Sequence, residues 1–211
     1  MSYKNMRFCE NLNVLQFETD GIYNTPVLEP CNYVPTEFIG FNYARSIKDK
    51  KSKGVHFFID DYQFERVWRM PTQYTSLLRE FNTVLTPDFS LYTDYPKAIQ
   101  IYNHYRKQWL GAYWQFLGLR VIPTIAWSNE DSYTWCFDGT PKGATVAVSS
   151  VGTQRSKASR LLFLAGWNEM IKRLKPETII FYGDIPKECN GNIIRVKSFQ
   201  EKFKEVKTDG W

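Results

Sequence analysis

The feature that most constrains the fold is an alternation of short apolar runs with longer amphipathic stretches, which begins at Val55. β-Branched and aromatic residues fill the short runs, as is typical of buried strands. Apolar residues spaced three or four apart in the longer stretches predict helices. The predicted strands follow one another at intervals of roughly 25 to 37 residues, the spacing of right-handed βαβ units. The chain is therefore predicted to be an α/β protein with a mainly parallel sheet.

Five runs have the composition of strands, and a sixth run precedes the C-terminal tail. They cover residues 55–59, 83–86, 121–125, 144–148, 178–182 and 192–196. Because five or six strands are too few for a complete eight-stranded barrel, we expect an open sheet or an incomplete barrel. A doubly wound sheet is the alternative. Pro123 is unusual for a central strand and predicts a bulge or an unpaired N–H.

Proline, glycine and serine residues mark the expected ends of the helices. One helical stretch is interrupted at Pro71, where a second helix can start. The longest helix is predicted to have Asp94 as its N-cap and to end at Gly118. Ser156 is predicted to cap a further helix, which Pro176 stops.

The length of 211 residues suits one domain with a full apolar core. Residues 1–54 precede the alternating pattern and have prolines spread through them, so we expect an irregular N-terminal arm that packs on the core. This arm ends in a basic loop, Lys48–Lys53. Residues 55–211 are expected to form the α/β core and a short charged C-terminal tail.

The composition is rich in aromatic residues and poor in histidine. Phe, Trp and Tyr make up 17% of the chain, whereas only His56 and His104 represent histidine. The four cysteines form no C-x-x-C pair. These facts disfavour a His-rich zinc site, a nickase with paired metal-binding histidines, and most Ser-His or Cys-His hydrolases. Carboxylate, arginine and aromatic chemistry is what the sequence leaves.

Charge and hydropathy bear on the partners of the protein. The formal net charge is +5, which permits contact with nucleic acid but does not establish it. No apolar run approaches the roughly 18 residues of a membrane helix, and no apolar signal core follows the first residues. We therefore expect a soluble cytoplasmic protein without a membrane partner.

Aspartates follow two of the predicted strands and are the candidate catalytic groups. Asp60 and Asp61 come after the first strand, and Asp88 comes after the second. The carboxyl ends of parallel strands open on one edge, so these side chains are expected to meet there. Asp60 and Asp88 are candidate ligands for Mg²⁺, which prefers oxygen. Alternatively, two carboxyl groups with separated pKa values would serve as acid and base in glycosidic chemistry.

Other polar and aromatic residues near the same edge are candidate ligand-binding groups. Loop aromatics would stack on a base or a sugar, an arginine on the longest helix would bind phosphate or carboxylate, and a Ser- and Gly-containing turn would bind an anion. These residues are Tyr92, Trp127, Arg106, Ser149, Ser150 and Gly152. The alternatives are core packing for the tryptophan, a salt bridge for the arginine, and helix capping for the serines. The turn lacks the lysine and the glycine spacing of a P-loop.

Several short segments of the sequence, in this order, resemble those of an uncharacterised family of domains of unknown function. They are FFIDDYQF at 57–64, TPDFSLY at 86–92, WLGAYWQ at 109–115, CFDG at 136–139 and VAVSSVG at 146–152. The family occurs in bacteria, their phages and mobile elements, so the resemblance implies such a context. The family has no assigned activity. The resemblance does imply that the segments at the strand ends belong to the sequence pattern of the family.

Three functional hypotheses follow. The first is an enzyme that acts on a nucleotide or nucleic acid by metal-dependent phosphodiester chemistry or by glycosidic chemistry. The second is a non-catalytic DNA-binding or replication-associated protein, which would use Lys48–Lys53 and the cationic tail. The third is a factor that binds a host protein or a signalling nucleotide.

Overall fold

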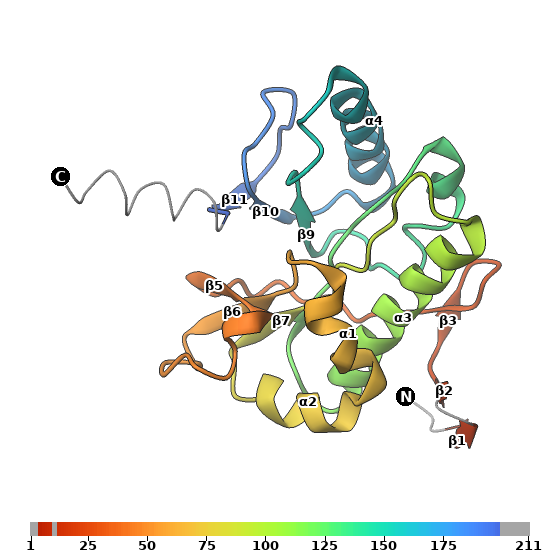
Figure 1. The fold of residues 1–211 in the computed structure, drawn as a ribbon, viewed down its shortest axis with the longest axis vertical. Helices are drawn as coiled ribbons and strands as arrows, with labels where there is room; N and C mark the ends of the chain where they lie inside the picture. The colour runs from red at the N-terminus through yellow and green to blue at the C-terminus, as the bar shows by residue number, and fades with distance from the viewer. Residues whose placement is uncertain (1–3, 10–11, 199–211) are drawn as a thin grey trace.

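The computed structural model describes residues 4–9 and 12–198, whose arrangement is drawn in Figure 1. Seven of the strands formed by these residues are parallel and fall into two hydrogen-bonded groups, in the orders β5-β6-β7-β8 and β11-β10-β9. Their bounds are β5 Glu37–Gly40, β6 Lys53–His56, β7 Thr83–Leu85, β8 Val121–Ile122, β9 Thr145–Ser149, β10 Thr178–Tyr182 and β11 Ile193–Val196. The predicted α/β class with a mainly parallel sheet is confirmed, with more strands than the sequence indicated.

The two groups of strands are joined just after β8. The backbone N–H of Thr124 donates to Thr86 Oγ1, and Thr124 Oγ1 donates to the Thr86 carbonyl oxygen, each over 2.8 Å. On the other side, Ala147 N donates to the Pro123 carbonyl oxygen and Ile125 N donates to the Ala147 carbonyl oxygen. The strand that contains β8 thus changes its pairing partner from β7 to β9 around Pro123, where the sequence predicts an irregularity.

Both faces of β6 to β10 are buried, which explains the nearly continuous apolar composition of these strands. Ile39, Val55, Val84 and Val121 are in register across the first group and belong to the core beneath the helices. Residues of the opposite face form a second cluster, which receives side chains from both edge strands and from strands between them. Its members include Phe38, Leu85, Ile122, Ala147, Ile180 and Val196. The sheet therefore curves into an incomplete barrel, and no pairing between β5 and β11 closes it among the described residues.

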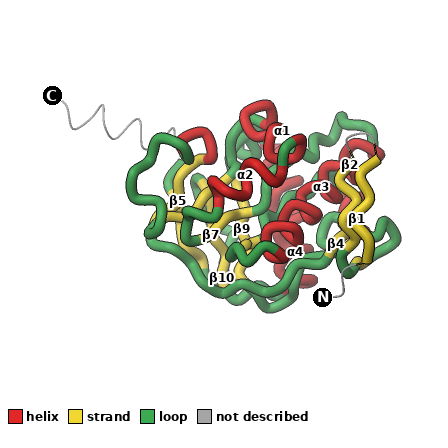
Figure 2. The backbone as a smooth tube through the Cα atoms, turned by 90° about the horizontal axis from the view of Figure 1, so that it is seen from below, coloured by secondary structure: helices red, strands yellow, loops and turns green. Residues whose placement is uncertain are grey.

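The described residues form four α-helices, which pack outside this sheet (Figures 1 and 2). They are α1 Asp61–Arg69, α2 Pro71–Leu78, α3 Lys97–Phe116 and α4 Lys157–Leu174, and two short 3₁₀ helices are η1 Phe41–Tyr43 and η2 Glu130–Thr134. α1 to α3 cover the first group of strands, and α4 covers the second. Within the described part of the chain, no helix is both long enough and apolar enough to cross a membrane.

The helix ends agree with the sequence signals except at the start of α3. Ser156 caps α4 by accepting from Ser159 N, and Gly118 follows α3 with a φ of 84°. The N-cap of α3 is Pro96 and not the predicted Asp94, which is exposed. Proline fixes the φ that a helix entrance requires, so the helix begins at the next residue.

The N-terminal region differs from the irregular arm expected over residues 1–54. Glu37–Gly40 is an edge strand of the sheet, because Phe38 and Ile39 alternate between its two buried faces. This apolar pair is too short to be recognised as a strand in the sequence. Earlier in the chain, β1 Lys4–Cys9 pairs with β2 Leu12–Gln16, and β3 Thr19–Asp20 pairs with β4 Thr25–Pro26, all antiparallel.

A glycine fastens the N-terminal region to the core. Gly139 N donates to Asp20 Oδ2 over 3.2 Å, and Leu28 N donates to the Gly139 carbonyl oxygen over 2.9 Å. Gly139 has a φ of 72°, and a Cβ built on it would lie 2.2 Å from the Pro26 carbonyl oxygen. Any side chain here would separate the two segments.

We predict that Gly139→Ala destabilises the fold by about 3 kcal/mol, since it combines left-handed strain with a backbone clash. The matched control is Gly118→Ala, because Gly118 also has a positive φ but has open space around it. The control should cost only about 1 kcal/mol. Urea denaturation of both variants measures the difference. Equal losses of stability would show that the contact with Pro26 does not hold the arm.

Candidate functional site

A cavity of about 940 Å³ lies at the carboxyl ends of the parallel strands. The ends of β5, β6, β9 and β10 line it, together with the loops that follow β6, β7 and β8. Its volume is within the range typical of small-molecule sites. We call it the main cavity, and it lies at the edge where the sequence predicts a site.

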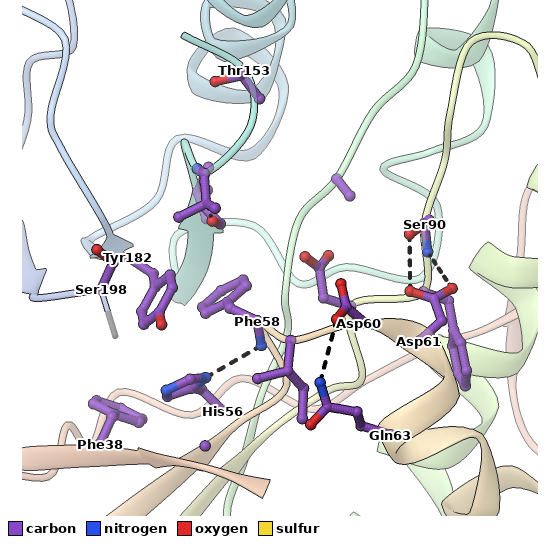
Figure 3. Close-up of a pocket in the computed structure, with 18 of the residues that line it drawn as sticks. Phe38, His56, Phe58, Asp60, Asp61, Gln63, Ser90, Thr153, Tyr182 and Ser198 are labelled. Atoms are coloured by element: carbon purple, nitrogen blue, oxygen red, sulfur yellow. Dashed lines mark hydrogen bonds between the residues drawn. The ribbon is translucent and has the colours of Figure 1, made fainter. Parts of the chain in front are cut away.

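Most of the residues predicted for the site line the main cavity, and three do not. Those in its wall are Asp60, Asp61, Asp88, Tyr92, Trp127 and Ser149. Arg106, Ser150 and Gly152 are not among the lining residues. Figure 3 shows His56, Phe58 and Tyr182 on one side of the cavity and Asp60, Asp61 and Ser90 on the other.

Asp61 is held rigidly at the start of α1. Its carboxylate accepts two hydrogen bonds from Ser90, one from the backbone N–H over 3.0 Å and one from the hydroxyl over 2.9 Å. The Ser90 carbonyl oxygen accepts in turn from Asn103 Nδ2 over 2.7 Å. This chain of bonds ties the loops after β6 and β7 to α3, so both loops keep their positions around the cavity.

Asp88 is the carboxyl group best suited to proton transfer. Burial raises its pKa from 3.8 to about 7, while the Lys107 ammonium opposes this shift and the Asp61 carboxylate adds to it. The Lys107 side chain is itself buried, with its residue 2% exposed, and burial lowers its pKa from 10.5 to about 8. Asp88 therefore exchanges a proton near neutral pH, as a general acid or base must.

Asp60 has a different environment. It is exposed at the N-cap of α1, and its Oδ2 accepts from Gln63 Nε2 over 3.4 Å. Asp60 and Asp88, the predicted magnesium ligands, both line the main cavity. However, the described residues contain no group of three or more His, Cys, Asp or Glu side chains arranged to hold a metal.

Aromatic side chains form much of the remaining wall. Tyr92 is 58% exposed, and Trp127 packs on Phe163 with ring centroids 5.3 Å apart. Phe58 and Tyr182 stack at 4.9 Å and add an aromatic surface that the sequence analysis did not identify. A flat ligand such as a nucleobase or a sugar ring would find stacking partners here.

His56 was missed for a specific reason. The predicted strand extends to residue 59, whereas β6 ends at His56, which therefore lies at the strand end and lines the main cavity. Its Nδ1 accepts from Phe58 N over 3.2 Å, so a neutral ring carries its proton on Nε2. A strand boundary set three residues earlier would have shown this histidine as a site residue.

Arg106 does not occupy the predicted phosphate-binding position. Its Nη1 lies 2.7 Å from Glu65 Oε2, and its guanidinium carbon lies 3.5 Å from the centroid of the Phe89 ring. A salt bridge was the alternative expectation, although the partner is a glutamate of α1 and not an aspartate of the sheet edge. Arg106 thus fastens α3 to α1.

The predicted anion-binding turn does not lie at a helix start. Ser150 Oγ donates to the Asp184 carbonyl oxygen over 2.6 Å, and Gly152 is exposed with a φ of 82°. α4 begins only at Lys157, where Ser156 already caps its first N–H groups. Ser149 alone of this turn's predicted residues faces the main cavity.

The basic loop is partly neutralised. Lys50 forms an ion pair with Glu80 over 3.0 Å, and Lys53 forms one with Glu37. The end of the charged C-terminal tail, residues 199–211, lies outside the described residues. The structure therefore adds no support for a nucleic-acid interface at Lys48–Lys53.

Comparison with known proteins gives a family and two phage relatives. A family model described as Domain of unknown function (DUF4417) matches residues 17–200. The "Gene 1 protein" of Mycobacterium phage L5 is 42% identical over 173 residues, which are 81% of this chain and 76% of that protein. The "Gene 1 protein" of Mycobacterium phage D29 is 38% identical over 202 residues, 93% of this chain and 75% of that protein. No solved structure matches the chain significantly. The resemblance carried by the sequence words is confirmed.

We predict that Gly166→Ala displaces the Trp127 ring. A Cβ built on Gly166 would lie 2.2 Å from Trp127 Nε1, so the indole must move in the cavity wall. The expected result is a shifted Trp127 indole N–H resonance in NMR spectra and a loss of about 1–3 kcal/mol of stability. Ala165→Ser, on the exposed neighbour in the same helix, should leave that resonance in place. An unmoved indole signal in the Gly166 variant would contradict this packing.

We also predict that the Asp88 carboxyl titrates near pH 7 in ¹³C NMR spectra. Lys107→Met removes the opposing positive charge and should raise this pKa, whereas Asp61→Asn removes a negative charge and should lower it. The pKa of Asp88 is higher in the folded state than the ordinary 3.8. The free energy of unfolding should therefore decrease as the pH rises from about 4 to about 7, because the unfolded chain loses this proton first.

Asp138 provides an internal control for the titration. Burial and the nearby Asp20 raise its pKa to about 6, with Arg173 opposing the shift. Its titration should therefore be unchanged in Lys107→Met. The carboxyl signal of Asp88 is identified as the one that disappears in Asp88→Asn. If that signal does not titrate above pH 6 in the wild type, the acid–base assignment of Asp88 is wrong.

Proposed function

The chain belongs to the DUF4417 family, and we propose that its main cavity binds a nucleoside or nucleotide and acts on the glycosidic bond. The observation that carries this proposal is the Asp88 carboxyl, whose pKa of about 7 lies near neutrality in a wall that also contains stacked aromatic rings. Stacking rings suit a base, and two carboxyl groups in different surroundings suit cleavage at the anomeric carbon.

The carboxyl groups would divide the work according to their surroundings. Protonated Asp88 donates its proton to the departing base as the bond between the base and the anomeric carbon breaks. Exposed Asp60 stabilises the positive charge that develops on the sugar and accepts a proton from the water that attacks the anomeric carbon. Asp61 keeps its hydrogen bonds to Ser90 and acts through its charge, which raises the Asp88 pKa.

The aromatic surfaces would orient the substrate. Phe58 and Tyr182 offer one stacked wall, and Trp127, fixed against Phe163 and Gly166, offers another. Base stacking contributes about 1–3 kcal/mol per base and tolerates any base, so it orients a nucleotide without selecting which base it carries. The phage relatives support a role inside the bacterial host cell.

Metal-dependent phosphodiester cleavage is the second candidate function. It is supported by Asp60 and Asp88 in one cavity wall, since Mg²⁺ needs only one or two protein carboxylates when water and phosphate complete its shell. Turnover with and without EDTA separates the two reactions, because carboxyl-only glycosidic chemistry needs no metal.

The proposal is tested with nucleosides, their 5′-monophosphates and a short single-stranded oligonucleotide, with base release followed by chromatography. We predict that Asp88→Asn lowers turnover by about 10²- to 10⁴-fold while ligand binding persists, since only proton transfer is removed. Asp94→Asn is the matched control, because Asp94 is exposed and does not line the main cavity. If no such compound binds, or if Asp88→Asn retains full turnover, the proposal fails.

A further inference from the structure

A second, smaller cavity of about 310 Å³ adjoins the main cavity and differs from it in charge. Arg45 and Arg66 line it together with Tyr62 and Tyr74, and no carboxylate is among its lining residues. The main cavity instead contains three aspartates in its wall, namely Asp60, Asp61 and Asp88. We call the second cavity the arginine pocket. It brings together the segment after η1 and the last turn of α1.

The two guanidinium groups of the arginine pocket have no carboxylate partner among the described residues. By contrast, Arg69 and Arg106 both form ion pairs with Glu65, over 3.7 and 2.7 Å. The Arg45 guanidinium carbon lies 5.7 Å from the Tyr74 ring centroid, which gives this side chain an aromatic support within the pocket. Two arginines in one small cavity form a positive site that matches a phosphate group, which each guanidinium can bind through two N–H donors.

The arginine pocket and the main cavity share two polar lining side chains. Asn42 and Gln63 line both of them. Gln63 Nε2 also donates to Asp60 in the main cavity. At Gly40 a Cβ would lie 2.5 Å from Asn42 Oδ1, so the absence of a side chain there permits the close approach of Asn42. The two cavities therefore lie next to each other, on either side of these amides.

We propose that the arginine pocket binds the phosphate group of a nucleotide whose sugar and base occupy the main cavity. This inference deepens the proposed function and rests on it, because it makes the substrate a phosphorylated nucleotide and not a free nucleoside. The phosphate belongs either to a mononucleotide or to a nucleic-acid strand, and both present the same chemistry to the two arginines. The division of charge keeps the phosphate away from the aspartates and beside the cations.

The first experiment measures binding of inorganic phosphate to the full chain by NMR titration. Arg45→Gln and Arg66→Gln should each weaken binding about tenfold, and the double variant should weaken it further. Arg69→Gln is the matched control, since it removes the same charge from α1 at a position that does not line the arginine pocket. Thermal unfolding of each variant checks that the fold is kept. Phosphate binding that is absent, or equal in all variants, overturns the inference.

The second experiment compares a deoxynucleoside, its 5′-monophosphate and a short single-stranded oligonucleotide as ligands. The wild type should bind the monophosphate at least tenfold more tightly than the nucleoside, and the double arginine variant should bind both equally. Equal wild-type affinities overturn the inference while nucleoside binding upholds the proposed function. Arginine-dependent phosphate binding without any nucleoside binding upholds the arginine pocket and refutes the proposed function. Tighter, salt-sensitive binding of the oligonucleotide assigns the phosphate to a strand.

Discussion

Thr124, which follows β8, links the two halves of the parallel sheet, because it exchanges two hydrogen bonds with Thr86 and forms a parallel bridge with Ala147 of β9. Both threonines are fully buried, so the bonds are shielded from water and fix the spacing of the strands. The hydrogen bonds of Ala147 to Pro123 and Ile125 complete this junction, which sets the loops after β6 and β7 beside the ends of β9 and β10. These loops and strand ends together line the main cavity.

The site depends on a division of charge along one edge of the sheet. Three aspartates lie in the aromatic main cavity, and two arginines without described carboxylate partners lie in the adjoining arginine pocket. The buried Lys107 limits the rise in the pKa of Asp88, so that this pKa stays near neutral pH. A ligand with an aromatic base and one phosphate fits this order of surfaces.

The sequence predicted the strand-end residues because parallel topology alone brings them together. Asp60, Asp88 and Trp127 needed only correct strands and the rule that carboxyl ends share an edge. Arg106 does not line the main cavity, because the packing of α3 turns this side chain toward Glu65 and Phe89, and a helical pattern does not reveal such packing. The edge strand β5 was missed because only two apolar residues mark it.

The arginine pocket was beyond sequence analysis for a different reason. Arg45 belongs to a segment expected to be irregular, and Arg66 belongs to a helix, so only tertiary packing of η1 on α1 brings them into one cavity. The most direct test of the account is a crystal structure with a saturating deoxynucleoside 5′-monophosphate. The account predicts density for the base against the aromatic wall of the main cavity and for the phosphate between Arg45 and Arg66. If density appeared at neither place, the proposed binding mode would be contradicted.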